Sequence, residues 1–304
     1  MSAKYPIISV TGSSGAGTTS VKRTFEQIFR RERIYAAYIE GDAFHRYNRD
    51  EMAAVMAEEE LKGNRHFSHF GADANLLEEL EAVFRTYSET GTAKTRHYVH
   101  DDEEAEHYGC PPGTFTDWEA LPEKSDLLFY EGLHGAVKTG KVNISQYPDL
   151  KIGVVPVINL EWIQKIHRDC SARGYTTEEV MDTMLRRMPD YVHYICPQFT
   201  ETDINFQRVP TVDTSNPFTA RWIPTADESM VIIRFARPRG IDFPYLHSMI
   251  RDSFMSRANS IVIPGNKLDL AMQLILTPLI LQIVERRKRL TQGRKIDERA
   301  GESF

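Results

Sequence analysis

A run of small residues between two apolar segments constrains the fold of this chain more than any other feature. Residues 5–11 (YPIISVT) are predicted to form a buried strand, and residues 19–31 carry apolar side chains at helical spacing. The run between them, residues 12–19, reads GSSGAGTT, and residues 34–39 (IYAAYI) predict a second strand. This order of strand, loop, helix and strand is a βαβ unit, which predicts a parallel sheet covered by helices.

The small-residue run has the spacing of a phosphate-binding loop. The pattern G-x-x-x-x-G-K-[ST] is met except at the lysine, where Thr18 stands. Glycines let several backbone N–H groups point at phosphate oxygens, and the following helix N-terminus adds partial positive charge. Thr19 can place its hydroxyl on Mg²⁺. The expected nucleotide contacts are Gly12, Ser13, Ser14, Gly15, Ala16, Gly17, Thr18, Thr19 and Ser20. The alternative is an ordinary glycine-rich turn.

Thr18 leaves the loop without its usual cation. One positive charge about 4 Å from a phosphate is worth roughly 4 kcal/mol at an effective dielectric constant of about 20. Lys165 and Arg168 offer a replacement, and they share one helix face with the carboxylate of Asp169, because residues three and four apart lie on the same face. Arg173 follows at the end of this segment. Such a segment is typical of a mobile lid that closes over a terminal phosphate. The alternative is a solvated helix face with paired charges.

Two carboxylates stand where predicted strands end. Asp42 follows the strand at residues 34–39, and Glu131 follows another at residues 127–130 (LLFY). In open α/β sheets, ligands bind beyond the carboxyl ends of the strands. A carboxylate there can accept the proton of an attacking hydroxyl, the role expected for Asp42. It can also hold Mg²⁺, directly or through water, the role expected for Glu131. Each is otherwise a turn or helix-capping acid.

The segment after Asp42 is rich in histidine, tyrosine and acidic residues. His45 and Arg49 lie four apart on an expected short helix and would supply cations for a phosphorylated acceptor. Tyr98 and His100 lie in a second polar run and are further candidates for contacts with the acceptor. Either run is otherwise ordinary surface.

The remaining segments predict more of the same architecture. Predicted strands lie at residues 152–158, 229–235 and 260–263, and predicted helices at residues 73–87, 160–170, 176–188 and 267–287. The sequence shows no repeat and no low-complexity linker, so we expect a single domain over residues 1–288. The polar residues 289–304 are expected to form a frayed tail.

The bulk composition excludes several classes of protein. The 304 residues carry a net charge of -6, whereas a nucleic-acid-binding chain is usually basic. The basic run at residues 286–289 (RRKR) is therefore interpreted as cations at a helix C-terminus. The three cysteines form no CxxC pair, and no uncharged apolar stretch approaches the length of a membrane span. We expect a cytoplasmic protein without a membrane or nucleic-acid partner.

Five motifs together resemble the phosphoribulokinase family: GSSGAGTT, EGDAFHR, FYEGLHG, INLEWIQKIHRD and INFQRVPTVDTSNPF. The resemblance extends from about residue 5 to about residue 285 and is strongest to the bacterial branch found with the Calvin cycle. It implies transfer of the γ-phosphate of MgATP to O1 of D-ribulose 5-phosphate. It also implies a P-loop kinase fold similar to that of nucleoside monophosphate kinases, with a mixed, mostly parallel sheet and helices on both faces. Bacterial members of the family carry threonine where the loop lysine usually stands.

The resemblance implies a role for individual residues. Asp42 is expected to be the general base, and Lys165 and Arg168 to stabilise the phosphoryl group in transfer. Asp169, with Glu131, is expected to serve the metal–nucleotide complex. The residues expected to bind the sugar phosphate are His45, Arg49 and Arg173.

The resemblance also implies regulation and assembly. Bacterial members are activated by NADH, inhibited by AMP and assembled as homo-oligomers. Arg31, Arg234 and Arg257 are candidates for an effector site or a subunit interface. Arg234 interrupts an apolar strand, so an edge-strand or salt-bridged arginine is the alternative for that residue.

Other functions fit parts of the same pattern. A uridine or pantothenate kinase shares the loop, the strand-end aspartate and the arginine lid, but the histidines and arginines near Asp42 favour a phosphorylated acceptor. A nucleotide-sensing module with decayed chemistry is disfavoured because the charged set is complete. Nucleic-acid binding through the basic run near the C-terminus is disfavoured by the net charge of -6.

Overall fold

Strands and helices alternate along much of the chain. The computed structural model describes residues 4–13 and 18–301, with side chains for residues 4–13, 21–171 and 174–291. The helices are α1 (Thr18–Glu32), α2 (Arg49–Leu61), α3 (Leu77–Thr90), α4 (Asp102–Tyr108), α5 (Ile158–Arg173), α6 (Thr177–Asp190), α7 (Gln198–Glu201), α8 (Phe243–Met249) and α9 (Leu268–Gly301). The strands are β1 (Ile7–Thr11), β2 (Ala36–Glu40), β3 (Lys94–Thr95), β4 (Glu119–Ala120), β5 (Leu127–Gly132), β6 (Leu150–Val155), β7 (Ile204–Pro210), β8 (Ser229–Phe235), β9 (Phe254–Arg257) and β10 (Ser260–Pro264).

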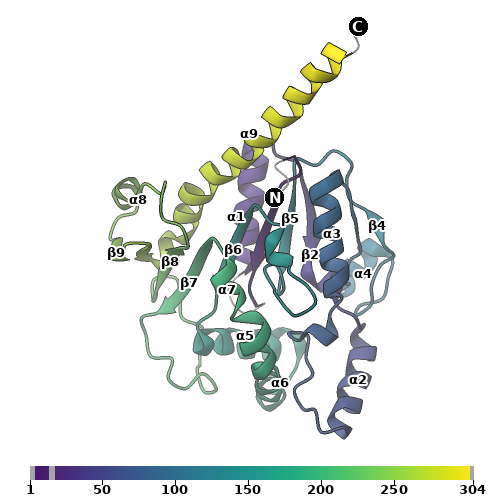
Figure 1. Ribbon diagram of the computed structural model, residues 1–304. Helices are drawn as coiled ribbons and strands as arrows, with labels where there is room; N and C mark the ends of the chain where they lie inside the picture. Colours follow the sequence, from purple (N-terminus) through teal and green to yellow (C-terminus); the bar gives the residue numbers. More distant parts are fainter. Residues whose placement is uncertain (1–3, 14–17, 302–304) are drawn as a thin grey trace.

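Strand β1, which precedes the phosphate-binding loop, lies inside a mixed sheet (Figure 1). Among the described residues this sheet has eight strands in the order β2-β5-β1-β6-β7-β8-β10-β9, and β3 pairs with β4 separately. Neighbouring strands from β2 to β7 pair in parallel, whereas β8, β10 and β9 join by antiparallel pairing. The prediction of an α/β fold with a mixed, mostly parallel sheet is confirmed.

The two faces of the sheet bury alternate residues of each strand, as the two-residue period of a strand requires. On β1, Ile8 and Val10 pack in the core that includes α1 and α9, whereas Ile7 packs in the core that includes α3. On β5, Phe129 belongs to the first core and Tyr130 to the second. Helices therefore cover both faces, which explains why apolar runs such as LLFY show no alternation.

Helix α9 begins close to the expected position and continues to Gly301, beyond the predicted end at residue 287. The helical segment Gly265–Thr291, which joins a short 3-10 helix to the first part of α9, is long and apolar enough to cross a membrane by length and composition alone. Several of its side chains are buried in the core shared with α1: Ala271, Met272, Ile275, Leu276, Ile280 and Val284. This packing explains the apolar face of α9, whose later part extends past the sheet in Figure 1.

Helix α2 starts later than the short helix expected after Asp42. The side chain of Asn48 accepts a hydrogen bond from the amide of Glu51 (2.9 Å), and the Glu51 carboxylate accepts one from the amide of Asn48 (2.9 Å). This capping box makes Arg49 the first helical residue. His45 precedes the helix in extended backbone, so the prediction that His45 and Arg49 share a helix is wrong.

Strand β7 was not predicted, because Gln207 and Arg208 interrupt its apolar pattern. It pairs with β6 and β8, and β8 is flanked in turn by β10. Arg234 of β8 therefore lies on an interior strand, and the edge-strand interpretation of this residue is wrong. Its guanidinium donates from Nη2 to the carbonyl oxygen of Phe199 (2.8 Å).

Phe129 is the residue on which we expect the sheet core to depend most. Its ring lies 4.9 Å from that of Phe25 and 5.7 Å from those of Phe29 and Tyr38. Phe129→Ala is expected to lower the free energy of unfolding by about 3–5 kcal/mol, because it leaves a cavity in a packed interior. Equilibrium urea unfolding measures the change. Phe254→Ala, at a half-exposed position of β9, is the matched control, and an equal loss there would contradict the assignment.

Candidate active site

The carboxyl ends of the parallel strands meet at one edge of the sheet. The register pairs Glu40 of β2 with Glu131 of β5, and Glu131 with Val10 of β1. The chain leaves this edge into the phosphate-binding loop, the turn that carries Asp42, and helix α5. Figure 1 shows α2, α5 and α6 gathered at this end of the molecule. Groups that are far apart in the sequence therefore converge.

Two glycines let the ends of β2 and β5 approach closely. A Cβ at Gly41 would lie 2.8 Å from the Cα of Gly132, and a Cβ at Gly132 would lie 2.6 Å from the Cα of Gly41. Both would also lie within 2.7 Å of the hydroxyl of Tyr130. Larger residues are excluded at both positions. The glycines of the EGD and YEGL segments thus bring Asp42 and Glu131 onto adjacent strand ends.

The phosphate-binding loop is tied to β5 and to α5. Gly12 donates its amide to the carbonyl oxygen of Gly132 (3.2 Å), and the hydroxyl of Ser13 donates to Oε1 of Glu161. The predicted contacts that lie outside the described residues are Ser14, Gly15, Ala16 and Gly17. For three further predicted contacts, Thr18, Thr19 and Ser20, the structure describes the backbone but not the side chains.

Asp42 is held between two histidines just beyond β2. Nε2 of His45 lies 3.2 Å from its Oδ1, and Nε2 of His100 lies 3.6 Å from its Oδ2. Burial raises the pKa of the Asp42 carboxyl, but His45, His100 and His69 outweigh burial and hold this pKa well below its usual range. The carboxylate is therefore ionised near neutral pH and can accept a proton.

Two further acceptor-site candidates lie beside this aspartate. The ring of Tyr98 lies 5.0 Å from that of His100 and 6.1 Å from that of His45. Arg49 donates from Nη2 to the carbonyl oxygen of His100 (3.0 Å). The structure thus groups these four predicted residues around the aspartate, while the side chain of Arg173 lies outside the described residues.

An arginine that sequence reasoning did not identify holds the Asp42 turn in place. Arg96 donates from Nε to the carbonyl oxygen of Ala43 and from Nη2 to that of His45, both at 2.8 Å. Its guanidinium lies 3.6 Å from the centre of the Phe115 ring. The segment between α3 and β5 therefore clamps the turn from outside the main sheet.

Helix α5 carries the predicted lid cations on one face. Asp169 accepts hydrogen bonds from Nζ of Lys165 and from Nε of Arg168, the latter at 2.9 Å. Burial and the nearby Arg187 lower the pKa of Lys165 to about 8, and the interaction with Asp169 opposes them. Burial raises the pKa of Asp169, but Lys165 and Arg168 lower it below its usual value. The structure brings the three predicted lid residues together as a buried charged group.

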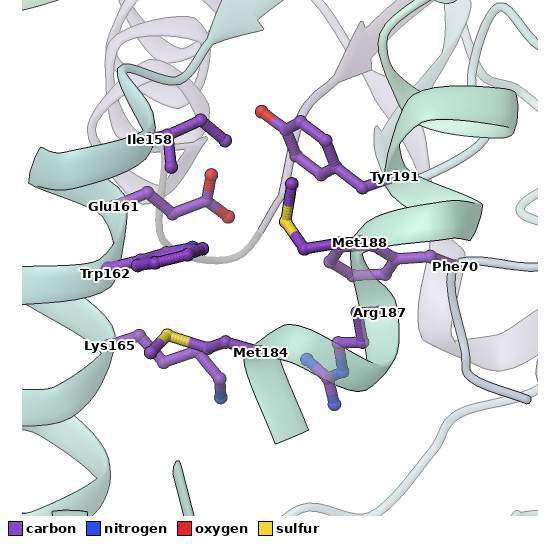
Figure 2. A pocket seen from close by; sticks show the side chains of 9 residues that line it. All are labelled: Phe70, Ile158, Glu161, Trp162, Lys165, Met184, Arg187, Met188 and Tyr191. Atoms are coloured by element: carbon purple, nitrogen blue, oxygen red, sulfur yellow. The ribbon is translucent and has the colours of Figure 1, made fainter. Parts of the chain in front are cut away.

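Figure 2 shows a pocket between α5 and α6 that contains one of these cations. Its lining residues are Phe70, Ile158, Glu161, Trp162, Lys165, Met184, Arg187, Met188 and Tyr191. The amino group of Lys165 and the guanidinium of Arg187 lie on the same side of this pocket. Two cations from different helices therefore face one space.

Arg187 connects the two groups of predicted residues, although nothing in its sequence spacing marked it. Burial lowers the pKa of its guanidinium, and the carboxylates of Asp169, Glu161 and Asp42 oppose that lowering. The Asp42 turn and the charged face of α5 thus lie within electrostatic reach of the same guanidinium. This closeness of Arg187 to both groups depends on the packing of α6 against α5, which the sequence pattern does not show.

Glu131, the carboxylate predicted to serve a metal–nucleotide complex, lies near the end of β5 within electrostatic reach of Lys22. Lys22 of α1 forms an ion pair with Glu40 and interacts electrostatically with Glu131. Among the described residues, no group of three histidine, cysteine, aspartate or glutamate side chains forms a metal cage. Both oxygens of Asp169 accept hydrogen bonds from cations.

The candidate effector arginines lie near the amino ends of the parallel strands, at the opposite end of the sheet from Asp42. Arg31, in the last turn of α1, donates to two polar side chains of α9 (2.8 and 2.9 Å). Arg234 pairs with Asn205 near the start of β7, at the amino end of the parallel strands. Arg234 and Arg257 both pair with Ser260, from either side of β10. These two arginines therefore lie in one cross-strand row, on the two strands that flank β10.

Comparison with known proteins agrees with this geometry. The model of the phosphoribulokinase / uridine kinase family matches residues 7–215. The phosphoribulokinase of Nitrobacter vulgaris is 78% identical over 286 residues, which cover 94% of this chain and 99% of that protein. The chromosomal phosphoribulokinase of Cupriavidus necator is 68% identical over 292 residues, 96% of this chain and 100% of that protein.

A solved structure shows the same fold. Phosphoribulokinase from Rhodobacter spheroides superimposes with a TM-score of 0.87 at 66% sequence identity, covering 94% of this chain and 100% of that chain. The predicted P-loop kinase fold is therefore confirmed. The chain belongs to the phosphoribulokinase / uridine kinase family, in its bacterial phosphoribulokinase branch, and is a kinase that transfers phosphate to an alcohol.

Proposed function

We propose that this chain transfers the γ-phosphate of ATP to O1 of D-ribulose 5-phosphate, giving ADP and ribulose 1,5-bisphosphate, the CO₂ acceptor of the Calvin cycle. The observation that carries the proposal is the carboxylate of Asp42, fixed between His45 and His100 at the end of a strand. An ionised carboxylate near the lid cations suits a hydroxyl group that attacks a phosphate. The names of the relatives support this choice of acceptor.

Asp42 is the proposed general base. A bond forms between O1 of the acceptor and the γ-phosphorus while the bond from that phosphorus to the leaving oxygen of ADP breaks, and the O1 proton passes to Asp42. The lowered pKa makes Asp42 a weak base. A loose phosphoryl transition state requires little proton removal before bond breaking, so the position of the carboxylate matters more than its basicity.

Lys165 and Arg168 are proposed to stabilise the phosphoryl group in transfer. Their ion pairs with Asp169 hold both cations on one face of α5. The partly buried Arg187 adds a third cation from α6. Positive charge that the loop lacks at Thr18 is thereby supplied from the lid. Positioned arginines contribute about 10³–10⁵ in rate to phosphoryl transfer.

Mg²⁺ enters the proposal as the partner of ATP. When bound, it neutralises charge on the β- and γ-phosphates. Glu131 is proposed to hold it, with the hydroxyl of Thr19 and the carboxylate of Asp169 as the other predicted ligands.

The phosphate of the acceptor is proposed to bind the basic groups around Asp42. An acceptor without an anionic group, such as uridine, would lack the charge-assisted hydrogen bonds that a phosphate makes with basic groups. The residues proposed for this contact are His45, Arg49, Tyr98, His100 and Arg173.

We further propose activation by NADH and inhibition by AMP in a cytoplasmic homo-oligomer. Arg31, Arg234 and Arg257 are the proposed effector or interface residues. Because they lie toward the edge of the sheet opposite Asp42, an effector bound there would not compete with the acceptor.

The acceptor assignment predicts a clear order of substrates. With MgATP, we expect ADP release with ribulose 5-phosphate and far slower release with uridine or pantothenate, because only the sugar phosphate supplies a phosphate group for the basic groups. A coupled assay for ADP measures the three rates. Turnover on uridine or pantothenate without turnover on the sugar phosphate would overturn the proposal.

NADH is expected to raise the rate of ADP release with ribulose 5-phosphate in the same assay, and AMP is expected to lower it.

Replacement of the proposed base gives a second prediction. Asp42→Asn keeps the shape of the side chain but removes its capacity to take a proton, so kcat on ribulose 5-phosphate is expected to fall by about 10²–10⁴-fold. Steady-state kinetics at saturating ATP measure kcat. Asp252→Asn, at an exposed position, controls for the loss of one carboxylate. A near-normal kcat for Asp42→Asn would rule out this residue as the base.

The lowered pKa of Lys165, about 8, predicts the alkaline limb of activity. As pH rises through about 8, free enzyme loses the proton of Lys165 and its positive charge, so kcat/KM is expected to fall. A bound phosphate raises this pKa, so kcat is expected to fall only at higher pH. Lys165→Arg, which stays charged, should lack the limb, whereas the exposed control Lys141→Arg should retain it. If kcat/KM of Lys165→Arg still falls as the pH rises through about 8, another group than Lys165 causes the fall.

A further inference from the structure

The side-chain amide of Asn75 is buried against the turn that carries Asp42. Asn75 follows the short 3-10 helix Ala72–Ala74 and is 1% exposed. Its Nδ2 donates to the carbonyl oxygens of His69 (2.8 Å) and Gly71 (2.6 Å). Because carbonyl oxygens only accept hydrogen bonds, this end of the amide is the nitrogen. The other end, Oδ1, is thereby fixed as an acceptor.

The fixed amide determines where His45 carries its protons. Oδ1 of Asn75 lies 2.9 Å from Nδ1 of His45, so Nδ1 has to be the donor. At the other side of the ring, Nε2 lies 3.2 Å from Oδ1 of Asp42, which also accepts. A neutral imidazole has a single N–H group, whereas both nitrogens of His45 face acceptors.

We infer that Asn75 is a positioning residue that keeps His45 an imidazolium, with one N–H group on the Asn75 amide and the other on the Asp42 carboxylate. The ring is 7% exposed, so water has little access to replace either contact. The consequence for turnover rests on the function proposed above. There, the imidazolium orients the base and adds positive charge where a phosphorylated acceptor binds.

The neighbours of His45 are consistent with a charged ring. Burial and Arg187 disfavour its charge, but Asp42 and Asn75 favour it and raise the pKa of His45 overall. His69 packs against the ring with centres 4.3 Å apart and planes tilted by 38°. Burial, and to a smaller extent the charge of His45, lower the pKa of His69 well below its usual value. His69 is therefore neutral and presents an aromatic face to the imidazolium.

The nearby ring of His134 does not compete for this charge. Burial lowers the pKa of His134 to about 4, so His134 is neutral near pH 7. Tyr98 meets the His45 ring edge-on at 6.1 Å, and His100 contacts the second oxygen of Asp42. Asp42 is thus the anion in direct contact with the His45 imidazolium.

The protonation state is measurable without substrate. In the full chain with isotope-labelled histidine, the ring signals of His45 are assigned by their loss in His45→Asn. At pH 7.5 we expect both ring nitrogens to carry protons, with deprotonation above the ordinary histidine pKa of about 6.5. A neutral His45 at pH 7 in the unmodified chain would overturn the inference.

Two replacements of Asn75 distinguish the hydrogen bond made by its amide from a nonspecific disruption of the structure. Asn75→Leu removes the acceptor, so the titration midpoint of His45 should fall by about one pH unit, a tenfold loss in proton affinity. Asn75→Asp keeps an acceptor of the same shape and adds negative charge, so its midpoint should be no lower than that of the unmodified chain. Should Asn75→Leu fail to fold, a lowered midpoint in Asn75→Asp still counts against the inference. Asn266→Leu, at an exposed position, should leave the midpoint unchanged.

Kinetics give an independent readout. In Asn75→Leu, KM for ribulose 5-phosphate should rise as pH increases from about 6 to about 8, because His45 loses its charge in that range. Asn75→Asp should restore the profile of the unmodified chain. A loss that is equal at every pH would indicate a merely structural role and contradict the positioning role. If the labelled chain behaves as expected but has no activity on ribulose 5-phosphate, the proposed function fails and the positioning role stands.

Discussion

Parallel hydrogen bonding of β5 to both β1 and β2 is the constraint on which the rest of the site depends. It aligns Glu40 with Glu131, and the close approach of the following glycines keeps the two strand ends adjacent. Each chemical group then lies on a segment that leaves this edge. A shift of one residue in the register would move Asp42 away from the phosphate-binding loop, because the side chains of a strand alternate between its faces. The buried apolar residues of β5 prevent such a shift.

Buried charge imposes the second constraint. A cation in a poorly hydrated site has to be paired, because an isolated buried charge is costly. Lys165 and Arg168 share the carboxylate of Asp169, and Asp42 is paired with two histidines. Phosphate oxygens are acceptors of the same kind as a carboxylate. The residues that hold the lid together in this arrangement are therefore the ones suited to receive a phosphate.

The parts of the site that could be predicted from sequence are those whose pattern is local. The loop has a fixed spacing of glycines, Asp42 follows a strand, and Lys165 and Asp169 are one helical turn apart. Asn75 and Arg96 act on partners 30 and 53 residues away, and no helical or strand period marks such contacts. The same reason explains the missed strand β7, whose pairing with β6 and β8 outweighs its mixed composition.

The threonine at position 18 changes how charge reaches the transferred phosphate. A lysine within the loop would lie beside the nucleotide whether or not an acceptor were present. In the proposed function, cations on α5 and α6 would lie beside it only with those helices in place over the site, which would couple charge stabilisation to closure. Transfer to water would then be disfavoured, because a closed site excludes it. The lowered pKa of Lys165 agrees with this arrangement, since a partly neutral lysine is less costly to keep buried next to Arg187. Binding of the phosphate restores its full charge at the moment when that charge acts.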